Sequence, residues 1–181
     1  MDTNKEIFTR LQNQIFSLLC KKAETALNQR EIAHLLKVSP TAVAKALPVL
    51  AKEKLIILQK EKRMNLSHVR LNRESIRSLR LKRVENLKLI YESGLSDFLH
   101  ENFPGATITL FGSYAFGDDT KVSDIDLAII GSKEKDLALD AFEKMFERKI
   151  NLNHYSSLKS IALNLKNSLM NGIVLEGFLE L

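Results

Sequence analysis

Hydrophobic positions near the start of the chain recur with a helical period, which predicts three helices in succession. A second helix begins after Asn28, whose side chain can cap the free amides, and Glu31 completes a capping box. A third begins at Ser39, with Pro40 in its first turn, and Pro48 inside it is expected to bend it by removing a hydrogen bond. The apolar positions of the first helix are Ile7, Phe8, Leu11, Ile15, Phe16, Leu18 and Leu19.

After the third helix the apolar pattern changes to that of a β-hairpin, over residues 55–58 and 66–71 with a charged tip between them. Two helices joined by a short turn and followed by a hairpin resemble the winged helix-turn-helix family of transcription regulators, over about residues 5–72. The resemblance implies a third helix that enters a DNA major groove and a wing that meets phosphates. The residues expected to bind nucleic acid are Ser39, Thr41, Lys45, Lys52, Lys62 and Arg63.

Charge is divided unevenly along the chain. Residues 1–83 hold 18 Lys and Arg against 7 Asp and Glu, a formal charge of +11, whereas residues 84–181 carry −6. A basic half favours DNA as a partner, and an acidic half favours a cation-dependent site. Two alternatives stay open, namely a charged surface that is only solvated and a winged helix that packs only on protein.

The 181 residues allow one large domain or two small ones. We expect a DNA-binding domain over residues 1–72, a connecting helix over 73–94 that packs within the chain or against a second copy in a homodimer, and an enzyme-like domain over 95–181. The absence of a long apolar run or a signal-peptide core predicts a cytoplasmic protein with no membrane partner. The single cysteine, Cys20, is expected to be a buried core thiol.

Two carboxylates in the second half, Asp124 and Asp126, stand one residue apart in an otherwise apolar run. Period-two alternation places both on one face of a strand, and two neighbouring like charges are costly to bury unless a cation lies between them. Gly112 and Ser113 follow another apolar stretch, residues 107–111. This strand, turn and strand suit a phosphate chain that is bound by backbone amides and neutralised by a carboxylate-held divalent metal.

The spacing of these residues resembles the DNA polymerase β-like nucleotidyltransferase superfamily, and more narrowly the minimal nucleotidyltransferases of archaea and bacteria. The similarity rests on Gly112-Ser113, ten residues and then Asp124-x-Asp126, with Gly117 and the run from Ser123 to Leu127. It covers about residues 96–181 and implies an α/β domain with a small mixed sheet. The whole chain is therefore expected to combine a winged helix with a polymerase β-like domain, an α+β / α/β fold.

The same resemblance implies a function for each of these residues. Asp124 and Asp126 would be catalytic and would hold Mg²⁺, and Gly112, Ser113 and Ser123 would bind the nucleotide. The reaction would move a nucleoside monophosphate from an NTP, with ATP expected, to an acceptor. The acceptor is open between a protein hydroxyl, a nucleic-acid end and a small molecule, and similar domains also act as antitoxin partners of small helical toxins.

Two departures from the family pattern favour an alternative. Asn151 stands where active members usually carry a third carboxylate, and an amide cannot act as a base. Phe116 stands where relatives often have a basic residue, for which Lys121 is a candidate substitute. The alternative is a DNA-binding regulator or antitoxin-like protein whose nucleotidyltransferase domain binds nucleotide with weak or no catalysis.

Other polar residues of the second half are expected to be structural. Asp118 and Asp119 are predicted to cap a turn, and the four histidines lack the spacing of metal ligands. The acidic residues Asp136, Asp140, Glu143 and Glu147 are expected to form the solvated face of a helix.

Overall fold

The computed structural model describes residues 7–61 and 66–179. The chain divides into two compact units, residues 1–82 and residues 83–181. Within the described residues, no helix has both the length and the apolar character needed to cross a bilayer.

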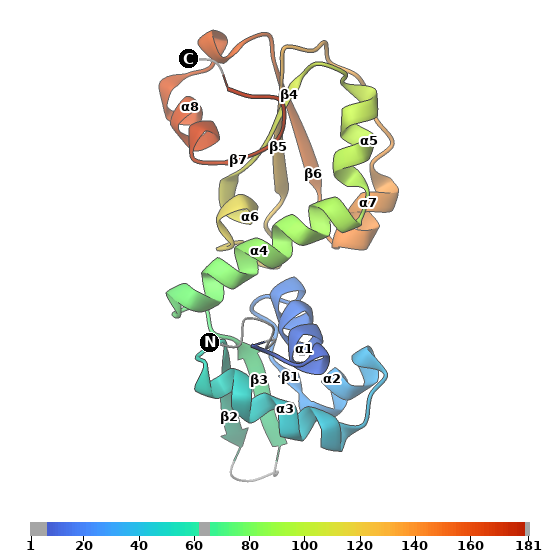
Figure 1. Cartoon of the computed structure of the whole chain (residues 1–181), viewed down its shortest axis with the longest axis vertical. Coiled ribbons are helices and arrows are strands. Elements are labelled where there is room, and N and C mark those ends of the chain that lie inside the picture. Colours follow the sequence, from blue (N-terminus) through green and yellow to red (C-terminus); the bar gives the residue numbers. More distant parts are fainter. Residues whose placement is uncertain (1–6, 62–65, 180–181) are drawn as a thin grey trace. The chain divides into compact units, whose positions relative to one another are not determined.

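The N-terminal unit is a winged helix-turn-helix (Figure 1). Three helices precede a hairpin, and a short strand adds a third member to the antiparallel sheet in the order β1-β3-β2. The core is apolar and draws on every helix, as the burial of Leu19, Ile32 and Leu50 shows. The elements are α1 (Arg10–Lys21), β1 (Leu27–Asn28), α2 (Gln29–Leu36), α3 (Pro40–Lys52), β2 (Ile56–Glu61) and β3 (Leu66–Leu71).

The helix starts predicted for α2 and α3 are confirmed. Asn28 Oδ1 accepts from the Glu31 amide at 3.0 Å, and Glu31 Oε2 accepts from the Asn28 amide at 2.6 Å, which completes the capping box. Ser39 caps α3 by accepting from the Ala42 amide at 3.1 Å. Helix α3 continues through Pro48.

Two features of this unit differ from the predicted pattern. Helix α1 begins at Arg10, because Thr9 caps it, so Ile7 and Phe8 lie before the helix. Strand β1 was not predicted, because two residues are too few to show alternation; it is defined only by its pairing with β3, in which Leu27 lies opposite Val69.

Helix α4 (Ile76–Glu92) lies within residues 73–94, and its residues are divided between the two units. Its first turns bond to the N-terminal unit, where the Ser78 hydroxyl donates to the Leu55 carbonyl at 3.1 Å. Its later turns belong to the C-terminal unit, in which Ile90 is part of the core.

The C-terminal unit contains a four-stranded mixed sheet in the order β6-β5-β4-β7. Strands β5 and β6 are parallel, and the other pairs are antiparallel. The predicted small mixed sheet is thus confirmed. The elements are α5 (Leu95–Asn102), β4 (Thr107–Phe111), α6 (Gly112–Phe116), β5 (Ile125–Ile130), α7 (Asp140–Phe146), β6 (Ile150–Tyr155), the 3-10 helix η1 (Leu158–Ser160), α8 (Leu163–Met170) and β7 (Ile173–Glu176).

Both faces of this sheet are covered. Alternate residues of β4 and β5 pack with α5 and Phe146 of α7 on one face, and the remaining ones pack with η1 and Leu169 of α8 on the other. In Figure 1, α5 and α7 accordingly lie on one side of the strands and α8 on the other. Asp126 alternates with Ala128 and Ile130, so it belongs to the face that α8 covers.

Candidate functional site

The two aspartates meet at the N-terminal end of β5. Asp124 directly precedes the strand, and Asp126 is its second residue. Asn151 of the parallel strand β6 is the register partner of Asp126. Its Nδ2 atom lies 3.2 Å from Asp124 Oδ2 and 3.0 Å from Asp126 Oδ1. Because one amide nitrogen reaches both carboxylates, the two side chains share one side of the strand, as their alternation predicts.

Gly112 packs directly against Asp126. It follows Phe111, the register partner of Asp126 on the other side of β5. Its φ is +71°, and a Cβ atom there would lie 2.9 Å from Asp126 Oδ2. Glycine is needed both for the backbone conformation and for the close approach of the carboxylate. Gly112 and Ser113 open α6, so the Gly-Ser pair and the aspartates do lie at one place.

Ser123 is engaged within its own loop. Its Oγ atom accepts from the Thr120 amide at 2.9 Å and lies 3.2 Å from Thr120 Oγ1. The hydroxyl therefore stabilises the turn before Asp124. Its predicted contact with nucleotide stays a prediction.

Asp119 is a buried charge, which differs from the turn cap predicted for it. Its Oδ2 atom lies 2.8 Å from Arg148 Nη2, in an ion pair whose side chains are 0% and 4% exposed. Its Oδ1 atom accepts from Asn86 Nδ2 at 2.7 Å, and the same nitrogen donates to the Tyr114 carbonyl at 2.9 Å. Local sequence gave no signal for this network, because its members lie far apart along the chain.

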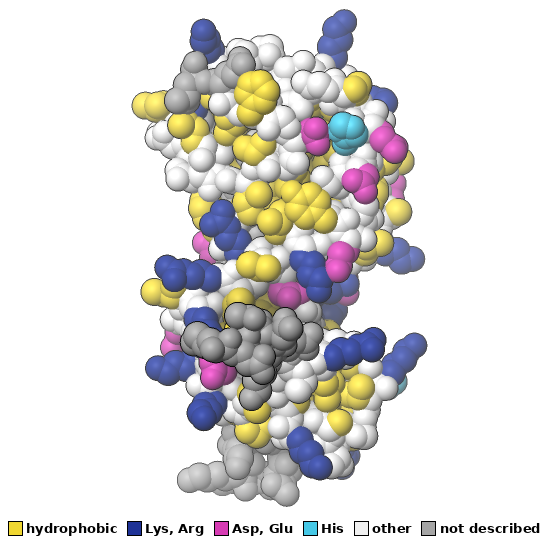
Figure 2. Space-filling view, in the orientation of Figure 1, with side chains coloured by type: hydrophobic (Ala, Val, Ile, Leu, Met, Phe, Trp, Pro, Cys, Tyr) yellow, Lys and Arg dark blue, Asp and Glu magenta, His cyan; other side chains and the backbone are white. Residues whose placement is uncertain are grey.

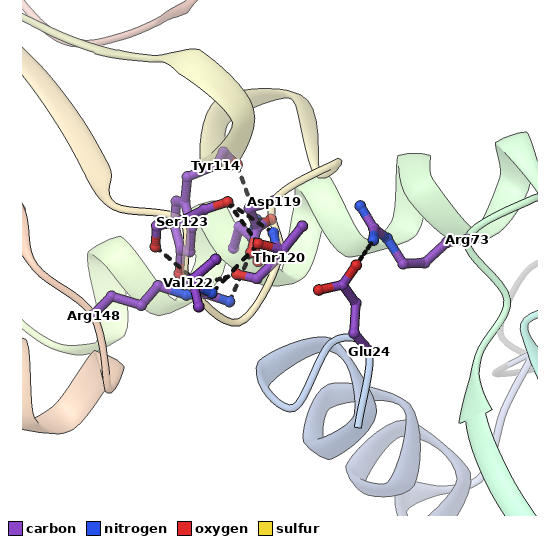
Figure 3. A network of polar contacts seen from close by, with 9 residues as sticks. Glu24, Arg73, Tyr114, Asp119, Thr120, Val122, Ser123 and Arg148 are labelled. Carbon is purple, nitrogen blue, oxygen red and sulfur yellow. Dashed lines mark hydrogen bonds and ion pairs between the residues drawn. The ribbon is translucent and has the colours of Figure 1, made fainter. Parts of the chain in front are cut away.

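Arg148 makes further contacts with the loop between α6 and β5 (Figure 3). It donates to the carbonyl oxygens of Thr120 and Ser123, and its guanidinium carbon lies 5.7 Å from the centre of the Tyr114 ring. Burial lowers the pKa of Arg148. Arginine nevertheless stays protonated in proteins, so the pair with Asp119 is ionic.

Glu143 and Lys149 form an ion pair at the edge of the site. Glu143 accepts from Lys149 Nζ at 2.8 Å and from the Ile150 amide at 3.0 Å, and these bonds lower the pKa of Glu143. The same hydrogen bond raises the pKa of Lys149. Glu143 is thus more than part of a solvated face, because it joins α7 to the start of β6.

The positively charged side chain of Arg83 lies beside Phe116. The Phe116 ring is 41% exposed, and the guanidinium carbon of Arg83 in α4 lies 5.8 Å from its centre. Phe116 replaces the basic residue expected from the family, yet Arg83 supplies a positive charge next to it. The other candidate, Lys121, is exposed.

The donors at Asp124, Asp126 and Asn151 fit a divalent cation. The described part of the chain has no group of three or more His, Cys, Asp and Glu residues that could hold a metal. The two carboxylates nevertheless converge on one point, where the amide nitrogen now lies. Half a turn of the Asn151 amide would present its oxygen there instead. Three oxygen donors of this kind would suit Mg²⁺, which prefers oxygen ligands.

Most residues predicted to bind nucleic acid are exposed on α3 or its cap. These are Ser39, Thr41, Lys45 and Lys52, with Ser39 also capping the helix. The predicted contacts at Lys62 and Arg63 lie outside the described residues. Several separate Lys and Arg side chains project from the visible face of this unit (Figure 2).

An open groove on α2 adds three basic residues that sequence reasoning missed. It has a volume of about 490 Å³ and is lined by Arg30, Ala33, His34, Lys37, Val38 and Pro40. Arg30, His34 and Lys37 are exposed, and their spacing along α2 places them on one side. The helical spacing of these three residues in the sequence could have indicated a basic face on α2.

The sequence matches one family of known domains, described as a nucleotidyltransferase domain, over residues 92–166. No curated protein matches the chain. The similar solved structures have low TM-scores. The adhesin competence repressor AdcR of Streptococcus pyogenes is 20% identical, over 53% of this chain and 68% of that chain, with a TM-score of 0.41. The zinc-responsive MarR family member ZitR of Lactococcus lactis is 25% identical, over 54% and 66%, with a TM-score of 0.37.

The matched residues contain the sheet edge at which Gly112, Ser113, Asp124, Asp126 and Asn151 meet. The order of helices and strands before them is that of a winged helix-turn-helix. The chain therefore joins an N-terminal winged helix-turn-helix unit to a nucleotidyltransferase domain.

Proposed function

We propose that the C-terminal unit binds a nucleoside triphosphate together with Mg²⁺ and transfers its nucleoside monophosphate to an acceptor. One observation carries the proposal: the Asp124 and Asp126 carboxylates converge beside the tight turn at Gly112. Paired carboxylates next to a backbone without a side chain suit a metal-bound phosphate chain. ATP is the expected nucleotide.

Each residue of the site has a distinct part in this proposal. Asp124 and Asp126 hold the cation, which when bound neutralises the triphosphate and stabilises the charge that develops on pyrophosphate. Gly112 leaves room for the phosphates, and Ser113 offers a hydroxyl donor beside them. Asn151 keeps the two carboxylates together.

The transfer forms one bond and breaks one. The acceptor oxygen attacks the α-phosphorus, the bond from that phosphorus to the bridging oxygen breaks, and pyrophosphate leaves. Asn151 cannot take the acceptor's proton, so this proton passes to water or to a basic group of the acceptor itself. We therefore expect slow turnover unless the acceptor is already activated.

The test is the transfer of label from α-labelled NTP in the presence of Mg²⁺. The wild-type chain is compared with Asp124→Asn and Asp126→Asn, each offered protein, nucleic-acid and small-molecule acceptors. Label transfer that both substitutions abolish supports the proposal. Transfer that persists unchanged in both variants contradicts it.

A second candidate is a DNA-binding regulator whose nucleotidyltransferase domain binds nucleotide with weak or no catalysis. The amide at Asn151 favours it, together with the basic exposed face of α3 and the three basic residues of the α2 groove. If the chain is such a regulator, we also expect it to form a homodimer or to bind a toxin as an antitoxin does.

Titration of the full chain with Mg²⁺ and each NTP separates the two candidates. Turnover of the bound nucleotide supports the enzyme. Binding without turnover, combined with a salt-dependent shift of duplex DNA, supports the regulator. An absence of DNA binding even at low salt counts against the regulator.

A further inference from the structure

One buried arginine connects the two sides of the proposed cation site, through the contacts of its side chain and through its place in the chain. Arg148 donates to the carbonyl oxygens of Thr120 and Ser123, the second at 3.0 Å, and Ser123 directly precedes Asp124. Arg148 also comes just before the strand that carries Asn151. A single side chain thus joins the loop that ends in Asp124 to the strand that places Asn151 against it.

The counter-charge of Arg148 extends these links to α6 and α4. Asp119 accepts from Arg148 Nη2 at 2.8 Å and from Asn86 of α4 at 2.7 Å. Asn86 also donates to the Tyr114 carbonyl in α6, the helix that Gly112 opens. The ion pair is therefore connected to the loop before Asp124, to α6 and to α4, and the dashed lines in Figure 3 show the contacts with the loop.

Burial excludes a direct part in binding a ligand. The side chains of Asp119 and Arg148 are 0% and 4% exposed, so neither reaches a nucleotide or a cation in the site. A buried ion pair also adds little stability compared with apolar side chains of similar size, because desolvation offsets the attraction. The distinctive feature of this pair is its hold on main-chain oxygens of the loop, which apolar side chains could not reproduce.

We propose that Arg148 and Asp119 are positioning residues, which hold Asp124 against Asn151 and α6 so that the cation site exists before the nucleotide arrives. The proposal rests on the proposed function and adds two residues to it. Neither residue forms part of the motif from which the site was predicted. Support of this kind around metal ligands typically changes metal affinity 10–100-fold.

The test is Mn²⁺ binding by the full chain, followed by the paramagnetic resonance signal of the free ion. The double variant Asp119→Leu/Arg148→Met replaces the ion pair with apolar side chains, and Arg148→Lys keeps the charge but not the fork of donors. We expect about 10–100-fold weaker binding in the double variant and a smaller loss in Arg148→Lys. Thr109→Val, a change at a fully buried residue of β4, is the matched control and should bind as the wild type does.

A second measurement needs no metal. The side-chain amide of Asn151 gives its own nitrogen–proton signals in a magnetic resonance spectrum, and its contacts with both carboxylates set their position. We expect these signals to move in metal-free Arg148→Lys, and to stay in place in Thr109→Val. This readout decides the proposal even where the double variant does not fold.

The outcomes separate this proposal from the function on which it rests. A folded double variant that binds Mn²⁺ as tightly as the wild type, or unmoved Asn151 signals in Arg148→Lys, overturns the positioning role. A wild-type chain that binds no Mn²⁺ overturns the proposed function, and the metal-free spectra then still decide whether Arg148 positions Asn151.

Discussion

Asn151 lies directly beside Asp126 in the parallel strand pair, and its side-chain nitrogen donates to that carboxylate at 3.0 Å. The same nitrogen reaches Asp124, so an amide dipole stands between two negative charges. This contact explains how the carboxylates stay together without a cation. Replacing Asn151 by Asp exchanges only the amide nitrogen for an oxygen, so this substitution adds a negative charge to the site with little change in shape.

Asn151→Asp should make stability depend on a divalent cation. Three carboxylates would meet without a donor between them, and we expect a loss of about 1–3 kcal/mol in the absence of metal. Mg²⁺ should restore more stability to this variant than to the wild type, because the added charge strengthens its binding. Thermal unfolding in chelator and in Mg²⁺ measures both effects.

The matched control is Asn153→Asp, on the same face of β6. Asn153 donates to the Leu127 carbonyl at 3.4 Å, one residue beyond Asp126 along β5. Its variant should show no larger response to Mg²⁺ than the wild type. An equal Mg²⁺ response in the two variants would mean that position 151 does not face the cation.

Comparing Gly112→Ala with Gly131→Ala should separate the effect of backbone strain on stability from the effect of the close contact between Gly112 and Asp126 on metal binding. Gly112 and Gly131 both have positive φ, +71° and +86°, so alanine at either should cost about 1–2 kcal/mol. Only at Gly112 would the new Cβ meet a carboxylate oxygen, at 2.9 Å. Urea unfolding should show losses in both variants, whereas Mn²⁺ affinity should fall only in Gly112→Ala. Equal Mn²⁺ affinity in the two would show that the contact does not matter.

Arg148→Met should be far more destabilising than a typical surface change. It removes the guanidinium that pairs with the buried Asp119 carboxylate, and breaking such a pair costs about 3–5 kcal/mol. The double variant Asp119→Leu/Arg148→Met should lose much less than the two single changes combined, because neither charge of this pair is left buried without the other. Chemical denaturation of the wild type, the two single variants and the double variant measures the coupling energy between Asp119 and Arg148. Strictly additive losses would show that the two side chains do not act as a pair.

The bond between Glu143 and Lys149 should give a pH-dependent contribution to stability. The pKa of Glu143 is lowered in the folded chain from an ordinary value of 4.5, so the contribution is present above that value. It is lost as the pH falls through the lowered pKa. The difference in unfolding free energy between wild type and Glu143→Gln should therefore shrink from pH 7 to pH 3. A difference that stays constant over this range would contradict the assignment.

Lys45→Ala should weaken DNA binding and reduce its dependence on salt. Each lost phosphate contact should lower the slope of log affinity against log salt by about 0.9. Arg30→Ala and Lys37→Ala test the α2 groove in the same way. Lys144→Ala removes an exposed lysine of α7 and serves as the control for net charge. Fluorescence anisotropy with a duplex gives all four slopes, and equal losses in every variant would point to charge alone.

Features that depend on neighbours along the chain were predicted well. The caps at Asn28 and Ser39 and the placement of Asp124 and Asp126 on one face follow from residues a few positions apart. Strand β6 and the place of Asn151 in it were also predicted. These signals are local, because a helix cap involves residues about three positions apart and strand alternation has a period of two residues.

The sequence by itself thus determined the two folds, the motif and the residue types at the proposed site. Only the tertiary structure decided that Asp119 pairs with Arg148 rather than capping a turn, that Asn86 joins them, and that β1 adds to the wing sheet. The reason is that these contacts join residues distant in the chain, and a charged side chain carries no local sign of the partner that folding brings to it.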